Sequence, residues 1–331
     1  MKFKDTAGRR ATLQALGAIA VSPWLAAKAV AADWPDRPIR LILPYEAGAA
    51  GDVLSRELGD AMRAEFGVAV VNENKPGGGT VVGANYVAKQ PADGYTLLIN
   101  GPATNVIMPA IQPRMPYDPN KDFDLIGLWA VVGSMISVHP SVPVNSIAEL
   151  VDYSKKNPGK LNYSSAGVGT GPHLGGELFK QMTGADIAHV PYKGAASATM
   201  ALVAGEVQVS FVNIPPQVAH VKAGKIRPLA VSMVARSSQL PDVPTAAEAG
   251  LTGYLSESWF GVAAPRGTPR PVVEKLQQAL LKAGQDAQRK ARLSAVGIEV
   301  RALGAREFGD YIQAEERRVL PLIRKLNLKS E

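Results

Sequence analysis

The sequence predicts an α/β fold of two lobes that share a cleft, and three observations support this prediction. Short apolar runs alternate with segments of helical spacing along most of the chain, which is typical of alternating strands and helices. Loops rich in glycine follow several of the expected strands. A long apolar run at Phe123–His139 separates two regions of similar design, so we expect it to pass from one lobe to the other.

The composition is that of a globular protein with a sizeable core. The chain has 331 residues, 46% of them hydrophobic and 20% charged, and this length suggests two domains of ordinary size. The net charge is +7, but the first 31 residues carry five basic residues and one acidic residue, which leaves +3 for the remainder. Because no basic run or aromatic stripe accompanies this excess, we expect no nucleic-acid partner. The absence of cysteine excludes disulfides and thiol catalysis.

Residues 1–31 have the pattern of a signal peptide. A basic start, MKFKDTAGRR, leads into an apolar run and then a small-x-small cleavage site that ends at Ala31. Thr12, Gln14 and Pro23 interrupt the apolar run, so it is a poor membrane anchor. We therefore expect export. The two arginines at 9 and 10 resemble a twin-arginine signal, so both the Sec and the twin-arginine export routes remain open.

The mature chain begins with a strand, a small-residue loop and a helix. The strand is Ile39–Leu43 and the loop is Tyr45–Gly51. Apolar residues at every fourth position then predict a helix, with Asp52 as its N-cap and Gly67 just after its end. Glu46 is the loop's one long charged side chain, so backbone N–H groups at the helix start can face an anion. An ordinary βα turn is the alternative.

Three consecutive glycines form the next candidate anion loop. A short strand at Val68–Asn72 precedes Gly77-Gly78-Gly79-Thr80, and a helix is expected from Val81 to Lys89. Residues without a Cβ allow a close backbone approach to a ligand. The glycine spacing matches neither the dinucleotide nor the P-loop fingerprint, so a nucleotide is not expected. A strand at Tyr95–Asn100 then leads to a polar loop, Gly101–Asn105, which brings Thr104 to the same rim.

The region after the crossing repeats this design. Ser146 is expected to cap a helix that ends at Lys156, and a second glycine-rich loop, Ser165–Gly171, precedes a helix at Pro172–Met182. The remaining expected elements are the strands Leu161–Ser164, Ile187–Val190, Val207–Val212, Ile226–Met233, Ser258–Ala264 and Ile298–Ala302, and the helices Ser197–Ala204, one ending at Ala223, one capped by Thr268 and one from Ala305. We expect Ile226–Met233 to return the chain to the first lobe, and Pro321 to kink or end the last helix.

Catalytic and metal-binding patterns are weak. The four histidines lack metal-ligand spacing, so His173 is expected to be structural. Ser164-Ser165 has no local base pattern and no nucleophile elbow, which disfavours a serine hydrolase. Asp52 is favoured as a cap over a ligand contact. Trp259-Phe260 is favoured as lobe core over a stacking platform.

Several blocks of the sequence resemble one family in order and spacing. They are PYEAGAAGD, NKPGGGTVVGANYVAKQPADGYTLL, PYDPNKDF, NYSSAGVGTGPHLGGELFKQMTG, HVPYKG and WFGVAAPRGTP. This succession resembles the Bug family, the extracytoplasmic solute receptors of tripartite tricarboxylate transporters. The resemblance implies a two-lobe periplasmic binding protein of type II-like architecture, with a hinged cleft between two mixed sheets flanked by helices. It also implies a small carboxylated ligand, transporter membrane subunits as partners, and no cofactor.

The resemblance also implies which residues bind the ligand. They are Tyr45, Glu46, Ala47, Gly48 and Asp52 in the first loop, Gly78, Gly79 and Thr80 beside it, and Ser165, Gly169 and Thr170 in the opposing lobe. Thr104 and Asn213, each at the end of an expected strand, complete the expected ligand-binding set. The sequence departs from the family pattern at Gly48-Ala49, where the usual glycine pair is missing, and at Asn213, where an aspartate is common. Glu46 is a third departure, because a small residue is usual there. A Glu46 that faces the cleft would favour monocarboxylates or zwitterions, whereas one that turns to solvent would play no part in selection.

The expected division is a signal peptide at 1–31, a first lobe from 32–130 and 230–331, and a second lobe from 131–229. The favoured function is periplasmic capture of a small organic acid, amino acid or aromatic acid for a transporter, without catalysis. One alternative is an exported α/β enzyme acting on carboxylated or acyl substrates. Another is a ligand-sensing receptor component that takes no part in transport.

Overall fold

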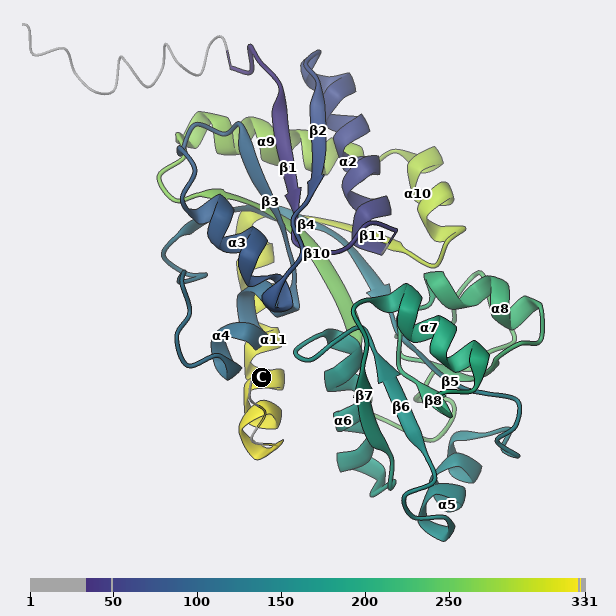
Figure 1. Ribbon diagram of the computed structural model, residues 1–331. Helices are drawn as coiled ribbons and strands as arrows, with labels where there is room; N and C mark the ends of the chain where they lie inside the picture. The colour runs from purple at the N-terminus through teal and green to yellow at the C-terminus, as the bar shows by residue number, and fades with distance from the viewer. Residues whose placement is uncertain (1–33, 49, 327, 329–331) are drawn as a thin grey trace, which may run out of the picture. The chain divides into compact units, whose positions relative to one another are not determined.

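The computed structural model describes residues 34–48, 50–326 and 328. The helices and strands of these described residues all lie within Pro35–Glu331 (Figure 1). The predicted signal peptide and its cleavage site lie outside the described residues. Within the described residues, no helix is both long and apolar enough to cross a membrane.

Two mixed sheets confirm the predicted fold class. The first has the order β11-β4-β10-β3-β1-β2, in which β1 pairs in parallel with β2 and β3 whereas β10 and β11 pair antiparallel. Its strands are β1 (Ile39–Leu43), β2 (Val70–Asn74), β3 (Thr96–Asn100), β4 (Phe123–Gly133), β10 (Glu257–Pro265) and β11 (Glu299–Gly304). We call this sheet and its covering helices the first lobe.

The second sheet has the order β7-β6-β8-β5-β9, with β6 parallel to β7 and β8 and with β5 antiparallel to β8 and β9. Its strands are β5 (Met135–Val138), β6 (Asn162–Ser165), β7 (Ala188–Pro191), β8 (Val209–Ser210) and β9 (Arg227–Val231). This sheet and its helices form the second lobe.

Helices cover both faces of the first sheet. They are α2 (Ala50–Phe66), α3 (Val81–Ala88), α4 (Met108–Ile111), α9 (Arg270–Ala283), α10 (Ala287–Ser294) and α11 (Ala305–Leu326), with helical turns η1 (Gly78–Thr80) and η2 (Ala103–Ile107). Helices α2 and α9 contact each other on one face. On the other face, α3, η2, α4 and α11 share one buried apolar cluster that includes Leu98, Leu128 and Phe308. Strands β1 and β3 are largely buried between these layers, as the apolar run of β1 predicts, whereas β2 at the sheet edge is partly exposed.

The second lobe is smaller and is covered in the same way. Its helices are α5 (Ile147–Lys156), α6 (Gly171–Thr183), α7 (Ala195–Ala204) and α8 (Val218–Lys222), with the turn η3 (Pro215–Gln217). Helices α5 and α6 contribute to an apolar cluster around Tyr163 and Phe211, whereas α7 packs with β5 and β9 in another. The Ser146 cap is confirmed, because its hydroxyl accepts a hydrogen bond from the backbone N–H of Glu149.

Three local predictions were wrong. Helix α2 begins by Ala50, so Asp52 lies in its first turn and does not cap it. The expected polar loop at Gly101–Asn105 is the start of the buried helical turn η2. Thr268 does not cap α9, whose N-cap is Pro269, and the Thr268 hydroxyl donates to the carbonyl of Pro265 instead. Each of these predictions depended on the exact residue at which a helix begins. Small and hydroxylic residues occur on both sides of such a boundary, so the sequence does not determine it.

The last helix resolves an open expectation. Pro321 lies inside α11, which continues to Leu326, so the proline does not end it. The helix remains packed on the first sheet through Phe308, Ile312, Val319 and Ile323. Tertiary packing therefore outweighs the missing backbone donor.

The chain crosses between the lobes at two places. Phe123–His139 makes the first crossing as predicted, because β4 belongs to one sheet and β5 to the other. The role expected for Ile226–Met233 was wrong, since β9 pairs with β5 in the second sheet. Leu240, Leu251 and Tyr254 also pack in the second lobe's clusters. The crossings therefore lie after the expected boundaries at 131 and 230: one falls between β4 and β5, and the other between β9 and β10. The boundaries were misplaced because an apolar strand has the same sequence pattern in either sheet.

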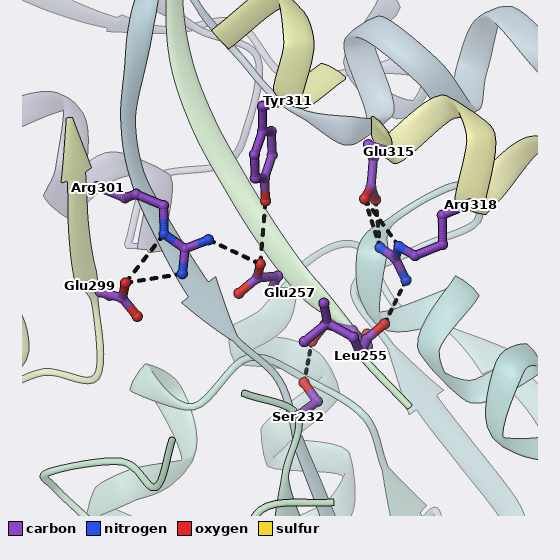
Figure 2. Close-up of polar contacts among 9 residues, drawn as sticks. Ser232, Leu255, Glu257, Glu299, Arg301, Tyr311, Glu315 and Arg318 are labelled. Carbon is purple, nitrogen blue, oxygen red and sulfur yellow. Dashed lines mark hydrogen bonds and ion pairs between the residues drawn. The ribbon is translucent and has the colours of Figure 1, made fainter. Parts of the chain in front are cut away.

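Polar contacts tie the second crossing to the first lobe (Figure 2). The Ser232 hydroxyl donates to the carbonyl of Ser256, and Arg318 on α11 donates to the carbonyl of Leu255 at 2.6 Å. Next along the chain, the buried Glu257 carboxylate accepts a hydrogen bond from the Tyr311 hydroxyl at 3.3 Å. Burial raises the pKa of Glu257. These contacts hold the strand that closes the base of the cleft.

Candidate functional site

A cavity of about 590 Å³ lies between the two lobes, where strand ends and helix starts from both sheets converge. This volume suits a small ligand. We call it the interlobe cleft, and its lining residues are Pro44, Tyr45, Glu46, Ala50, Gly51, Pro76, Gly77, Gly78, Gly79, Thr80, Pro102, Ala103, Met108, Gln112, Ala166, Gly167, Val168, Thr170, Gly171, Pro172, Tyr192, Lys193, Gly194, Ala195, Asn213, Pro216, Ser258 and Phe260.

The triple glycine forms one wall of the cleft in the conformation that its sequence predicts. Gly77, Gly78 and Gly79 have φ values of 133°, 55° and 62°, which side chains with a Cβ rarely adopt. A Cβ at Gly79 would lie 2.6 Å from the Met108 sulfur. We call Gly77–Thr80 the first cradle, and its three glycines leave the backbone without side chains beside the cleft.

Thr80 extends the left-handed backbone beyond the glycines. Its φ of 91° is the one positive value at a non-glycine residue in the described part of the chain. The buried Thr80 hydroxyl accepts a hydrogen bond from the Thr104 hydroxyl at 3.0 Å, and the Tyr117 hydroxyl donates to the Thr104 carbonyl at 2.9 Å. This hydroxyl network holds a strained residue behind the cradle.

Tyr45 and its loop form the adjoining wall. The Tyr45 ring meets Phe260 edge to face at 5.7 Å between centroids, and burial raises the pKa of its hydroxyl. A Cβ at Gly101 would lie 2.7 Å from that hydroxyl, so only glycine fits there. Asp52 points back into its own loop, where it accepts from the backbone N–H of Gly48 at 3.2 Å and pairs with Arg56.

The second-lobe wall is the glycine-rich loop before α6. Thr170 is the N-cap residue of α6, and its hydroxyl donates to the carbonyl of Gly167 at 2.7 Å. Ser165 lies behind the loop, fully buried, with its hydroxyl 2.7 Å from His189 Nε2. The backbone N–H of Gly169 donates to His173 Nδ1 at 3.2 Å. Two histidines thus support this second cradle, Ser165–Thr170.

The two histidine rings stack on each other. Their centroids are 4.1 Å apart at an interplanar angle of 13°, and the Tyr163 ring stacks on the outer face of His189. Burial is the main cause that lowers the pKa of both histidines, to about 3 for His189, and the neighbouring charge of Lys180 adds to it. Both rings are therefore neutral at neutral pH and act as structural supports, as the sequence predicted for His173.

Asn213 forms the base of the cleft near the crossings. Its side-chain amide donates to the carbonyl of Val132 at 3.2 Å and to the Ser258 hydroxyl at the same distance. Asn213 also forms an isolated bridge with Ser134, the residue between β4 and β5. It therefore joins the strands of the two lobes where the chain crosses.

The structure brings together part of the predicted set. The residues that line the cleft are Tyr45, Glu46, Gly78, Gly79, Thr80, Thr170 and Asn213. Those outside the lining are Ala47, Gly48, Asp52, Thr104, Ser165 and Gly169. Among these, Thr104 bonds to Thr80 behind the first cradle, and Ser165 and Gly169 belong to the second cradle and bond to the two histidines. Ala47 and Gly48 are exposed.

Sequence reasoning missed several lining residues. Lys193 and Gly194 follow a Pro-Tyr pair that repeats the one at Pro44-Tyr45, so a signal was present. Met108 and Ser258 carried no such signal, because they reach the cleft only through tertiary packing. Phe260 was expected in the core, yet its side chain also lines the cleft.

Helix starts surround the cleft. The first residues of α2, η2, α6 and α7, and the residues just before α3, all line it. Helix N-termini present unpaired backbone N–H groups and attract negative charge. The described residues contain no group of three or more His, Cys, Asp or Glu side chains placed to hold a metal ion. The arrangement suits an organic anion that is held by backbone groups.

A second cavity of about 230 Å³ lies between α6 and α11. Its lining includes Glu257, Glu315 and Arg318. These groups already form contacts within the protein, since Arg318 pairs with Glu315 and Glu257 with Arg301 (Figure 2). The interlobe cleft is therefore the better candidate site.

Comparisons with known proteins agree with this fold and cleft. A family model described as the tripartite tricarboxylate transporter family receptor matches residues 54–328. The protein BugT of Bordetella pertussis is 32% identical over 82% of this chain and 84% of its own length. A structure of an R. palustris protein with adipate has a TM-score of 0.85 and 35% identity, covering 90% of this chain and 99% of its own. The periplasmic binding protein BugD has a TM-score of 0.82 and 31% identity over 90% of this chain and all of its own. The chain therefore belongs to the tripartite tricarboxylate transporter receptor family and is a solute-binding receptor.

Proposed function

We propose that this receptor captures a small carboxylate in the interlobe cleft in the periplasm and delivers it to the membrane subunits of a tripartite tricarboxylate transporter. The observation that carries the proposal is the convergence of helix starts and positive-φ glycines from both lobes on one cavity. The adipate named with the R. palustris structure is a ligand of this chemical class. The signal-peptide pattern and the family's periplasmic receptors support the location, with cleavage near Ala31.

The first cradle supplies the binding chemistry. Carboxylate oxygens accept hydrogen bonds from backbone N–H groups, and the start of α3 adds a favourable dipole. Thr80 and its hydroxyl partners hold this backbone in place before the ligand arrives, which reduces the entropy lost on binding. The second cradle completes the enclosure when the lobes hold the ligand between them.

A Ser–His contact makes an exported hydrolase the alternative to consider, because Ser165 and His189 are 2.7 Å apart. Ser165 is fully buried and does not line the cleft. The pKa of His189, lowered by burial to about 3, makes it a weak general base at neutral pH. This geometry favours binding over hydrolysis.

Mass spectrometry of the purified mature protein tests the proposal. We expect a carboxylate to co-purify, to be recovered unchanged after incubation, and to raise the thermal midpoint when added back. A ligand at 100 times its Kd stabilises the native state by about 2.7 kcal/mol. Conversion of the ligand to a product would favour the enzyme, and normal uptake of the acid by cells lacking the protein would favour a sensor. A panel of carboxylates without any thermal shift would contradict the proposal.

A further inference from the structure

The cleft lining carries two charged side chains among its described residues, Glu46 and Lys193. Glu46 belongs to the β1–α2 loop of the first lobe, whereas Lys193 lies just before α7 in the second. Both side chains are exposed at the cleft mouth. The remaining lining is neutral, so these two charges decide which end groups a ligand can bring to this part of the cleft.

The Glu46 carboxylate reaches across to the second lobe. Its Oε2 atom lies 3.1 Å from the position that a Cβ would take on Gly194, and its Cδ atom lies 3.9 Å from that position. Gly194 has an extended backbone with φ of 179°, which any residue can adopt. A side chain at Gly194 would therefore touch the Glu46 carboxylate, which would have to move by a few tenths of an ångström.

This position matches the charge of the second lobe. Gly194 is the N-cap residue of α7, a helix of ten residues, and negative charge is favoured beside a helix start. Glu46 already supplies that charge from within the protein. A ligand carboxylate at the same place would meet both the occupied position and the repulsion of a like charge. At about 4 Å near a protein surface, that repulsion is worth roughly tenfold to several hundredfold in affinity.

Resting on the carboxylate site proposed above, we propose that Glu46 makes this receptor select ligands with a single carboxylate, and above all those with a cationic group at the opposite end. The ligand carboxylate binds the first cradle, and its far end lies towards Glu46. An ammonium group there gains an ion pair, an uncharged end is tolerated, and a second carboxylate is repelled. The ligand class is therefore a zwitterionic or neutral-tailed monocarboxylate.

Lys193 offers the opposite selection, because its ammonium would attract a second carboxylate. Both side chains are exposed, but the contact with Gly194 places the Glu46 carboxylate across the cleft beside the start of α7. A long, exposed lysine gains little from an ion pair after the cost of ordering its side chain. The two residues make opposite predictions for one set of ligands.

The test uses acids of equal chain length that differ only in the far end. Calorimetry measures the binding of hexanoate, 6-aminohexanoate and adipate, and of butyrate, 4-aminobutyrate and succinate, to the mature protein at pH 7.5. We expect the amino acid of the better-bound series to bind at least about tenfold tighter than its dicarboxylate. Glu46→Gln should reduce that ratio by about tenfold or more. Glu274→Gln removes an exposed charge on α9 that lies outside the cleft lining and should leave the ratio unchanged.

Other outcomes overturn the inference in different ways. A dicarboxylate that binds as tightly as its amino counterpart, or an unchanged ratio in Glu46→Gln, would refute selection by Glu46 while leaving the carboxylate site intact. A ratio that responds to Lys193→Gln instead would assign selection to the lysine. Failure of all six acids to bind either protein would overturn the proposed carboxylate site itself, and the inference with it.

Discussion

The two cradles face the same cleft but are supported by different chemistry. Behind the first cradle, Gly77–Thr80, lies a network of hydroxyl groups from Thr80, Thr104 and Tyr117. Behind the second cradle, Ser165–Thr170, the buried His173 stacks on the partly buried His189, and both rings are neutral at neutral pH. One support is therefore insensitive to proton concentration in the physiological range, whereas the other contains groups that can be protonated.

This difference assigns separate roles to the two lobes. Burial raises the pKa of Tyr45 and Tyr117, so neither phenol ionises where the protein works. The first lobe therefore offers a constant backbone site. In the second lobe, protonation of His173 or His189 would bury a charge and remove an acceptor. We therefore expect the first lobe to set the affinity for the ligand. In the second lobe, we expect the protonation of the histidines to set how the stability of that lobe depends on pH.

The largest effect is expected from Gly79→Val. A β-branched residue disfavours the φ of 62°, and its Cβ would collide with Met108. We expect a loss of affinity of about a hundredfold, because a misplaced backbone at the cradle would lose about three hydrogen bonds worth about 1 kcal/mol each. Isothermal titration calorimetry with the co-purifying acid measures it.

The matched control is Gly67→Val at the end of α2. Gly67 has a φ of 71° and open space where its Cβ would lie. The Gly67→Val variant should lose a similar amount of unfolding free energy through backbone strain but keep its affinity for the ligand. Equal affinity in the two variants would show that the first cradle takes no part in binding.

Low pH should destabilise the folded protein through the protonation of His189 beside the second cradle. The pKa of His189 is about 3 in the native state against the ordinary 6.5, so the unfolded chain binds more protons below pH 6.5 and stability falls as the pH drops. Between pH 7 and pH 5, His189 should account for about 1–2 kcal/mol of lost unfolding free energy, allowing for its partial exposure. Denaturant unfolding at the two pH values measures this loss.

His189→Gln is the matching variant, because its amide can still meet the Ser165 hydroxyl but does not titrate. We expect its stability to fall less between pH 7 and pH 5 than that of the wild type, while Glu177 and Lys180 keep their ion pair beside the site. An equal fall in both proteins would show that His189 does not carry the pH dependence.

A smaller effect on affinity than that of Gly79→Val is expected from Thr104→Val, which removes one hydroxyl behind the first cradle. The Thr80 hydroxyl would lose its donor, and we expect about 1–3 kcal/mol of lost stability with a several-fold loss of affinity. Thr268→Val removes a buried hydroxyl bonded to a backbone carbonyl away from the cleft. The Thr268→Val control should lose stability without losing affinity. If Thr104→Val bound the ligand as tightly as the wild type, the hydroxyl network would have no role in binding.

Much of the fold was predictable because its signals are local. The apolar run of β1, the triple glycine before α3 and the Ser146 cap each depend on neighbouring residues. The return of the chain to the first lobe was not predictable in this way. An apolar strand such as β9 fits either sheet, and only its pairing with β5 decides between them.

The site was predictable where backbone conformation carries it and not where packing does. The three consecutive glycines predicted the first cradle from the sequence. Met108 and Ser258 were not predicted, because they reach the cleft from distant parts of the sequence. Thr104 and Ser165, also expected in the site, are not among the residues that line the cleft, and their hydroxyls bond to Thr80 and His189. The sequence indicated the right loops, but only the fold decides which face of each loop meets the cleft.

The most direct test of the central claim is an amide NMR titration of the mature, isotope-labelled protein with the carboxylate that binds most tightly. The account predicts the largest shift changes at Gly78, Gly79 and Thr80, with accompanying changes at Thr170 and Gly171 of the second lobe. Unchanged amides at these positions, with shifts confined to the cavity between α6 and α11, would contradict it.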